Sequence, residues 1–230
     1  MYALVLAGGK GERLRPHTDT VPKPMVPLNG RPLLDYHVEW LRQGGVTDVV
    51  FLTRYLAEVV EDHFGDGSRF GISAHYSVED HPLGRGGALK LGYAQVPADE
   101  IEIIGTNGDI ITEQPLAEII DAHRRNRAAA TVMLTKLVSP FGLVETDDRG
   151  WVRDFREKPQ LPYWLNAGVY VLTPEFFALC PEEGDHEDST FPELARRGRL
   201  LGYKTERYWQ AVDSIKDLNV VAERLAVPAA

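Results

Sequence analysis

Short apolar segments alternate with segments of helical periodicity along the first half of the chain, and this alternation restricts the possible folds more than any other feature. Strands are predicted at Tyr2–Ala7, Asp48–Thr53, Ile72–Ser77 and Ile101–Gly105, and helices at Leu33–Gln43, Ala57–Phe64, Ala88–Val96 and Leu116–Arg127. Strands that alternate with helices form a mostly parallel sheet covered on both faces. We therefore predict an α/β, Rossmann-like fold.

The second half of the chain predicts further strands. These strands are expected at Ala130–Lys136, Gly142–Thr146, Trp151–Glu157 and Ala167–Leu172, with a hairpin turn at Asp147–Gly150 and helices at Pro174–Leu179, Phe191–Arg197 and Ser214–Leu225. The sheet is thus expected to be mixed. We predict a single domain over residues 1–230, with a nucleotide-binding half at about 1–128, a second half at about 129–225, and a short Ala/Pro tail that frays.

The composition limits the partners of the protein. The net charge, 25 minus 34 or −9, disfavours nucleic acid as a general partner. The single cysteine, Cys180, cannot form an internal disulfide, and no charged leader with a long apolar segment precedes Ala3. The apolar run Ala3–Ala7 is far shorter than the roughly 20 residues that span a bilayer. We expect a cytoplasmic protein without a membrane partner, in which a local basic cluster holds any polyanionic ligand.

The loop Gly8–Pro24 behind the first strand is that basic cluster. Ligands of open α/β sheets bind at the carboxyl ends of the strands, where this loop begins. Glycines let a backbone approach a ligand closely and present N–H donors to anions. Arg13 and Lys23 add a fixed guanidinium and a compact ammonium, which both suit phosphate oxygens. The combination predicts a triphosphate site.

Two common phosphate motifs do not fit this loop. A dinucleotide fingerprint requires a third glycine where Leu14 stands, and a P-loop requires a hydroxyl residue that Gly9-Lys10-Gly11 lacks. For the Gly-x-Gly pattern alone, a glycine-rich surface loop with solvated charges is an equally good interpretation. The longer pattern around it decides between the two.

That longer pattern resembles the signature of the sugar-phosphate nucleotidyltransferases. The similarity rests on Gly8-Gly9-x-Gly11-x-Arg13-Leu14-x-Pro16-x-Thr18, Pro22-Lys23-Pro24-Met25, Pro82–Ala88, Asn107-Gly108-Asp109, Glu157-Lys158-Pro159, Asn166-Ala167-Gly168 and Trp209–Asp213. The motifs occur in the order typical of that family and extend over nearly the whole chain. The resemblance implies a nucleotidyltransferase architecture, similar to glycosyltransferase A. Many relatives also carry a hexapeptide-repeat β-helix, which is not expected here.

The resemblance implies that a sugar 1-phosphate attacks the α-phosphate of a nucleoside triphosphate and releases pyrophosphate. A phosphate monoester is already an anionic nucleophile, so catalysis consists of alignment and charge neutralisation. By position, Arg13, Lys23 and Asp109 are the catalytic candidates, and Asp109 and Asp213 would bind Mg²⁺. Alternatively, Asn-Gly-Asp is simply a turn, or Asp213 is a helix N-cap. The metal role of Asp213 is the less secure because Ser214-Ile215 departs from the family pattern.

The same resemblance assigns the nucleotide contacts. They are Leu6, Ala7, Gly8, Gly9, Gly11, Arg13, Lys23, Pro82, Gly84, Gly87 and Asn107. Gly86 and Gly87 could instead only ease the start of a helix. Arg85 departs from the family pattern, and three roles stay open for it: a phosphate contact, stacking on the base, or exposure to solvent. The Ala-Gln pair typical of thymidylyl transfer is absent, which favours guanylyl or uridylyl transfer. Among single-domain relatives, the chain resembles those that use GTP with mannose or heptose 1-phosphate. Uridylyl or thymidylyl transfer to another hexose or aminosugar 1-phosphate is the alternative.

The sugar-phosphate side is predicted around Glu157-Lys158-Pro159. By resemblance, Lys158 would bind the phosphate, Glu157 and Asn166 the sugar hydroxyls, and Gly142 would lie alongside. Residues from about 129 to 225 would then form the sugar-phosphate-binding half. A charged pair at the end of a strand is, however, more often a solvated surface feature.

Two rival functions stay open from the sequence. A regulatory subunit could keep the fold without the chemistry, although Arg13, Lys23, Asp109 and Lys158 together disfavour this. A glycosyltransferase would need an Asp-x-Asp motif, whereas Asp109 is followed by Ile110-Ile111. The sequence leaves open the base, the sugar, feedback regulation and whether the protein is a homodimer.

Overall fold

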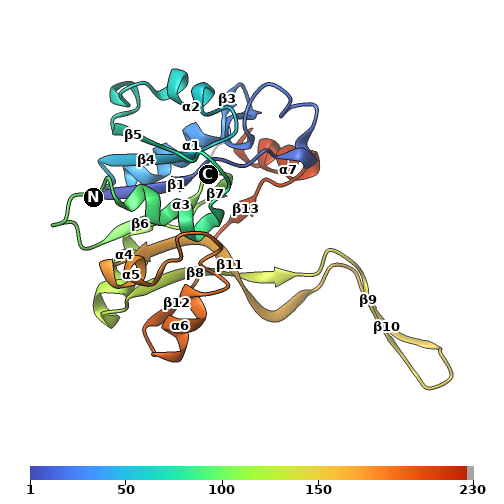
Figure 1. Ribbon diagram of the computed structural model, residues 1–230. Helices are drawn as coiled ribbons and strands as arrows, with labels where there is room; N and C mark the ends of the chain where they lie inside the picture. The colour runs from blue at the N-terminus through green and yellow to red at the C-terminus, as the bar shows by residue number, and fades with distance from the viewer. Residues whose placement is uncertain (227–230) are drawn as a thin grey trace.

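The computed structural model describes residues 1–226 (Figure 1). The strands are β1 Tyr2–Leu6, β2 Pro27–Leu28, β3 Arg31–Pro32, β4 Asp48–Thr53, β5 Ser73–Val78, β6 Ile103–Asn107, β7 Ile110–Thr112, β8 Ala130–Val138, β9 Leu143–Thr146, β10 Val152–Arg156, β11 Gln160–Leu172, β12 Leu200–Lys204 and β13 Trp209–Ala211. The helices are α1 Leu33–Gln43, α2 Ala57–Phe64, α3 Gly84–Tyr93, α4 Leu116–Asn126, α5 Pro174–Leu179, α6 Thr190–Arg196 and α7 Ile215–Ala226. No helix within residues 1–226 is both long enough and apolar enough to cross a bilayer.

The main sheet has seven strands in the order β12-β8-β11-β6-β1-β4-β5. β1 pairs in parallel with β4 and β6, β4 with β5, and β12 with β8, whereas β11 runs antiparallel to both β6 and β8. The predicted mixed, mostly parallel α/β sheet is therefore confirmed. Strands from both halves of the sequence form this one sheet.

Helices cover both faces of the sheet and create two apolar cores. One core packs α1, α2 and α4 on one face of the central strands, where Val5, Phe51 and Ile104 are fully buried. The other core packs α3, α5 and α6 on the opposite face, around Leu4, Leu52 and Tyr170. Central strands that are buried on both faces explain the continuous apolar runs of the sequence.

A third apolar cluster anchors the glycine loop. Leu14 of that loop packs with Val26 and Leu28, with Val212, and with Leu218 and Val221 of α7. The beginning and the end of the chain therefore meet on one side of the sheet, as Figure 1 shows for α7 and the blue N-terminal loop. This packing fixes the loop relative to the strand ends.

Several elements differ from the sequence prediction. α3 begins at Gly84, four residues before the predicted Ala88, because the loop around Gly184 accepts hydrogen bonds from the Gly86 and Gly87 N–H groups. β11 extends back to Gln160, and β7, β12 and β13 were not predicted. The short strands β7 and β13 exist only because they pair with each other. Local periodicity carries no signal for such a distant pairing.

The predicted hairpin turn at Asp147–Gly150 is confirmed, since β9 and β10 pair antiparallel and the Gly150 N–H donates to Asp147 O. This two-stranded ribbon projects from the body of the protein (Figure 1). Trp151, Phe155 and Phe141 are exposed on and beside it. The predicted fraying of the terminal tail concerns residues 227–230, which lie outside the described part of the chain.

Candidate active site

A cavity of about 560 Å³ lies where β1, β4 and β6 end. Its lining residues are Leu6, Gly8, Gly9, Arg13, Lys23, Pro24, Leu52, Arg54, Glu79, Pro82, Gly84, Arg85, Ala88, Asn107, Asp109, Asp185, Ala211 and Asp213. All the predicted nucleotide contacts except Ala7, Gly11 and Gly87 are among them. The three predicted catalytic residues and both predicted metal ligands face this one cavity.

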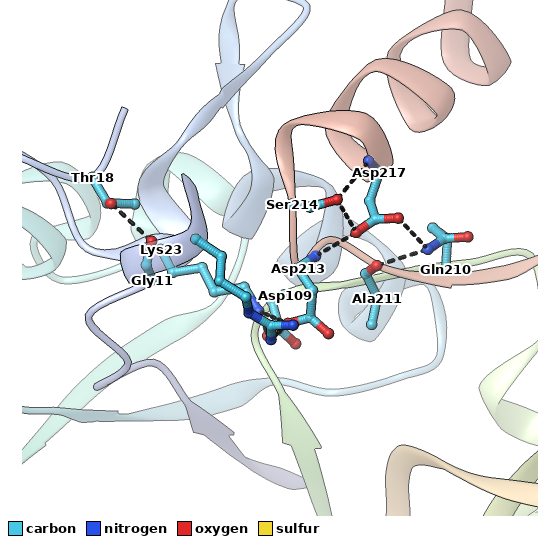
Figure 2. Close-up of polar contacts among 10 residues, drawn as sticks. Gly11, Thr18, Lys23, Asp109, Gln210, Ala211, Asp213, Ser214 and Asp217 are labelled. Atoms are coloured by element: carbon cyan, nitrogen blue, oxygen red, sulfur yellow. Dashed lines mark hydrogen bonds and ion pairs between the residues drawn. The ribbon is translucent and has the colours of Figure 1, made fainter. Parts of the chain in front are cut away.

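Lys23 joins the two aspartates at the floor of the cavity. Its Nζ lies 2.5 Å from Asp109 Oδ2 and 2.5 Å from Asp213 Oδ1. Figure 2 shows the Lys23 side chain reaching toward both carboxylates. The Arg13 guanidinium lies 3.0 Å from the same Asp213 oxygen. Two carboxylates more than one hundred residues apart thus converge on one cation. We call this group, Arg13, Lys23, Asp109 and Asp213, the phosphate corner.

Backbone pairing brings the two aspartates together. Asp109 lies two residues after β6 and directly before β7, and the Gly108 N–H donates to Leu6 O at the end of β1. The Val212 N–H donates to Asp109 O, next to the β13–β7 pair in which Ala211 faces Ile110. Residue 213 is therefore held beside residue 109 by main-chain hydrogen bonds.

Asp213 does not cap the final helix. Ser214 takes that role, because its Oγ accepts from the Asp217 N–H and donates to Asp217 Oδ2 (Figure 2). Asp217 Oδ2 also accepts from the Asp213 N–H. The N-cap interpretation of Asp213 is thus wrong, and its carboxylate is left to face Lys23.

Gly11 closes the loop onto Lys23. Its φ of +63° lies in the left-handed region, and a Cβ there would stand 2.8 Å from Lys23 Cβ and 3.0 Å from Thr18 Cγ2. Thr18 Oγ1 donates to Gly11 O at 2.9 Å, and the Lys23 N–H donates to Gly9 O at 3.3 Å. The glycine at position 11 therefore serves the fold of the loop rather than the lining of the cavity.

The charges of the phosphate corner reinforce one another. Burial alone would lower the pKa of Lys23, but Asp109 and then Asp213 outweigh it and raise that pKa above its usual value. Burial would likewise raise the pKa of Asp213, yet the hydrogen bond and charge of Lys23, with Arg13, lower it. The ammonium and the Asp213 carboxylate are consequently both charged at neutral pH.

A buried histidine holds the backbone next to Asp109 of this corner. His37 is fully buried, its Nδ1 donates to Ile110 O at 3.1 Å, and Thr106 Oγ1 donates to its Nε2 at 3.1 Å. Burial lowers the pKa of His37 to about 4. A neutral imidazole therefore fixes the residue that follows Asp109.

The predicted sugar-phosphate residues lie outside the lining of the cavity. Glu157 and Lys158 are largely exposed at the base of the β9–β10 ribbon, with 3.6 Å between Lys158 Nζ and Glu157 Oε1. Gly142 lies beside them, since a Cβ there would stand 2.9 Å from Glu157 Oε2. These three residues form a second group, which we call the ribbon base.

Asn166 of β11 lies behind the cavity wall. Its Nδ2 donates to Tyr170 OH at 2.9 Å, and its Oδ1 accepts from the Gly168 N–H at 2.9 Å. Gly168 has a φ of +70°, and a Cβ on it would stand 2.6 Å from Nδ2 of Asn107, which lines the cavity. The irregular part of β11 that Asn166 holds thus packs directly against the cavity wall.

Sequence reasoning missed three charged residues of the cavity lining: Arg54, Glu79 and Asp185. Arg54 directly follows β4, and this strand-end position could have identified it. Asp185 stands in the acidic segment Gly184–Asp188, whose composition is typical of a solvated loop. Its place in the cavity depends on a contact across one hundred residues, with Arg85.

The chain is similar to many proteins of known function. Mannose-1-phosphate guanylyltransferase of Mycobacterium tuberculosis is 37% identical over 223 residues, which cover 94% of this chain and 62% of that protein. The mannose-1-phosphate guanyltransferase of Yarrowia lipolytica is 36% identical over 224 residues. UTP–glucose-1-phosphate uridylyltransferase of Synechocystis is 34% identical and covers 94% of this chain and 63% of that protein. The chain thus spans somewhat under two thirds of the length of these relatives.

Solved structures show the same fold. HddC from Yersinia pseudotuberculosis superposes with a TM-score of 0.78 at 23% identity, over 97% of this chain and 99% of that chain. A putative glucose-1-phosphate thymidylyltransferase from Bacillus anthracis gives 0.78 at 23% identity, over 100% of this chain and 97% of that chain. The Nucleotidyl transferase family matches residues 2–226. With this match, and with relatives above 30% identity along nearly all its length, the chain belongs to the Nucleotidyl transferase family.

Proposed function

We propose that this protein transfers a nucleotidyl group from a nucleoside triphosphate to a sugar 1-phosphate and releases pyrophosphate. GTP is the favoured donor and a mannose or heptose 1-phosphate the favoured acceptor. The convergence of Lys23, Arg13, Asp109 and Asp213 on one cavity behind a glycine loop carries this proposal. With a divalent cation held by its two carboxylates, such a corner would have the positive charge to hold and neutralise a triphosphate. A cytoplasmic site of action is part of the proposal.

The choice of substrates rests on relatives. Those named mannose-1-phosphate guanylyltransferase reach 37% identity, and one solved HddC structure is described as a complex with GMP-PN. The relative named UTP–glucose-1-phosphate uridylyltransferase, at 34% identity, supports uridylyl transfer as the second candidate. A nucleotide-sugar-binding regulatory subunit is the non-catalytic alternative.

Asp109 and Asp213 fit a hard divalent cation such as Mg²⁺. Asp109 Oδ1 is buried and has no hydrogen-bond partner within residues 1–226, and the two carboxylates already share one cationic neighbour in Lys23. Across these residues no three His, Cys, Asp or Glu side chains cluster as a complete ligand set. Two carboxylates suit Mg²⁺, which takes its remaining oxygens from phosphates and water. When bound, the ion would neutralise charge on the reacting phosphates.

The residues of the chain supply the remaining chemistry. Arg13 and Lys23 neutralise the triphosphate and the charge that develops on the pyrophosphate leaving group. The attacking sugar phosphate is already an anion at neutral pH, so no side chain has to remove a proton from it. Glu157, Lys158, Asn166 and Gly142 bind this substrate in the proposal.

A substrate matrix tests the proposal directly. Purified protein with Mg²⁺ is incubated with GTP, UTP, dTTP, ATP or CTP and with the 1-phosphates of mannose, glucose, an N-acetylhexosamine or a heptose. Release of pyrophosphate, highest with GTP and a mannose or heptose 1-phosphate, is expected. Highest release with UTP and glucose 1-phosphate would favour the second candidate. Folded protein that releases none in any pair would contradict catalysis.

A further inference from the structure

Arg85 is held by two carboxylates from the other half of the chain. Its Nη2 lies 2.7 Å from Asp185 Oδ2, and its Nη1 lies 2.9 Å from Glu187 Oε1. The Arg85 N–H donates to Asp185 Oδ1 at 2.8 Å. Arg85 and Asp185 both line the cavity. The guanidinium therefore has a fixed position in the cavity wall.

Glycines allow the segment around Asp185 to lie directly on the start of α3. A Cβ on Gly84 would stand 2.7 Å from the Gly184 carbonyl carbon, and one on Gly86 would stand 2.8 Å from Gly184 O. The Gly86 and Gly87 N–H groups both donate to Gly184 O. The glycine cluster therefore brings two backbone segments together and thereby places Asp185 beside Arg85.

This arrangement excludes a phosphate at the start of α3. The N–H groups of Arg85, Gly86 and Gly87, which could bind an anion, already donate to Asp185 and Gly184. Arg85 is one cation between two carboxylates, whereas the phosphate corner has two cations for its two carboxylates, so a triphosphate is disfavoured at Arg85 relative to the phosphate corner. Of the three roles left open by the sequence, a phosphate contact is thereby removed.

Arg85 nevertheless keeps free donors toward the cavity. A guanidinium has five N–H donors, and the side-chain contacts with Asp185 and Glu187 occupy two. About half of its side chain is exposed, at 49%. The neighbouring lining at Leu52, Pro82 and Ala88 is apolar and suits a flat ring. The phosphate corner is assigned to the triphosphate, so this part of the cavity receives the base.

We infer that Arg85, fixed by Asp185 and Glu187, selects a nucleobase that carries a carbonyl oxygen, and this inference rests on the proposed nucleotide site. Arg85 donates to O6 of guanine or O4 of uracil. Adenine and cytosine carry an amino group at the corresponding position. This amino group is a hydrogen-bond donor, and the guanidinium of Arg85 has no acceptor for it. The ion pairs hold the guanidinium in place before the nucleotide binds, so little side-chain freedom is lost on binding.

ITP and ATP form the sharpest test, because at position 6 of the purine ITP has a carbonyl and ATP an amino group. The measured quantity is the ratio of kcat/KM for ITP to that for ATP. We expect Arg85→Met to lower this ratio about 10- to 100-fold, the range of discrimination by a well-placed arginine–base contact. Arg85→Lys, which keeps the charge but loses the fork, and Asp185→Asn, which weakens the ion pair, should each give a smaller decrease.

Arg124→Met is the matched control. Arg124 also pairs with a carboxylate, Glu102, at 2.6 Å, but it does not line the cavity. The ratio should stay within about twofold of wild type in this variant. An unchanged ratio in Arg85→Met would overturn the inference. If the ratio is unchanged because kcat/KM falls equally for ITP and ATP, the result would indicate a phosphate contact instead. If Arg85→Met does not fold, Arg85→Lys and Asp185→Asn decide in the same way.

The inference and the proposed function can fail separately. If no pair of substrates releases pyrophosphate, the proposed transfer is wrong, and the affinities of ITP and ATP measured by calorimetry take the place of kcat/KM. A preference for ITP that depends on Arg85 would then still support base selection. Tight binding of both nucleotides without such a preference would contradict it while leaving the nucleotide site in place.

Discussion

The phosphate corner and the ribbon base are built in opposite ways. In the phosphate corner, Lys23 is only 12% exposed, and three segments of the chain supply four interlocked charges. In the ribbon base, Glu157 and Lys158 are 62% and 50% exposed and adjacent in sequence, and they contact mainly each other. The first group is organised by the fold itself. The second depends on a projecting two-stranded ribbon.

This difference predicts which kinetic parameter each group of charges affects. Charges that ion pairs between distant segments hold in place are aligned before substrate arrives, so removing one should affect turnover. Exposed charges lose side-chain freedom only when they bind, so removing one should mainly weaken the affinity for its substrate. Five experiments test this contrast.

The largest effect is expected for Asp109→Asn. One charge of the phosphate corner disappears while the size of the side chain is kept, so kcat should fall by about 10² to 10³. Steady-state pyrophosphate release measures this, and circular dichroism checks the fold. Asp148→Asn, in the exposed turn of the ribbon, should leave kcat unchanged. Near-normal turnover in Asp109→Asn would remove this residue from the site.

Lys23→Met should reduce kcat by about 10²-fold, and it should also change the response to metal. Without the ammonium, Asp109 and Asp213 repel each other, so Mg²⁺ should raise the Tm of this variant more than that of wild type. Thermal unfolding with and without Mg²⁺ measures the difference. Lys204→Met, an exposed lysine on β12, is the control. An identical Mg²⁺ response in both variants would contradict the proposed metal ligands.

Gly11→Ala should destabilise the loop by about 1–3 kcal/mol, because position 11 has a positive φ and no room for a Cβ beside Lys23. Urea unfolding measures the loss. Gly9→Ala is a matched control in the same loop, since a Cβ there meets no atom within 4 Å. Equal stability of the two variants would show that the loop is not held in the described conformation.

Lys158→Ala should raise KM for the sugar 1-phosphate about tenfold, equivalent to about 1.4 kcal/mol, with little change in KM for the nucleotide. Its stability should match that of wild type, because the side chain is half exposed and, within residues 1–226, its ion pair is with its neighbour Glu157. Two-substrate kinetics separate the two KM values. A loss confined to kcat would erase the contrast between the ribbon base and the phosphate corner.

The smallest effect is expected from pH. Burial holds the pKa of His37 at about 4, below the value of about 6.5 in an unfolded chain, so the unfolded state binds more protons between these values. The stability that this residue contributes is complete above pH 6.5 and is lost as the pH falls toward 4. Between pH 7 and pH 6 the loss should be under about 1 kcal/mol.

Urea unfolding of wild type and His37→Gln at both pH values measures this contribution. The decrease should be smaller in the variant, although His186, with a pKa of about 4, still contributes. An identical decrease in both proteins would show that His37 does not titrate in this way. This titration should lower turnover only at pH values at which the protein begins to unfold.

The local features of the site were predictable, whereas its distant contacts were not. The strand at Asp48–Thr53 and the helices at Leu33–Gln43 and Ala57–Phe64 agree with the structure to the residue, because apolar periodicity is a local signal. The loop with Arg13 and Lys23 was found because it follows an apolar strand. The role of Ser214 as helix cap was missed, because either of two adjacent polar residues could serve as the cap.

The α/β class, the glycine loop with Arg13 and Lys23, and the family could all be read from the amino-acid sequence. Only the folded chain shows that Asp109 and Asp213 share Lys23, that Asp185 and Glu187 hold Arg85, and that Glu157 and Lys158 lie outside the cavity. The physical reason is the range of the interactions. Periodicity and turn chemistry act over a few residues, whereas these ion pairs depend on strands and loops that lie side by side only after the sheet has formed.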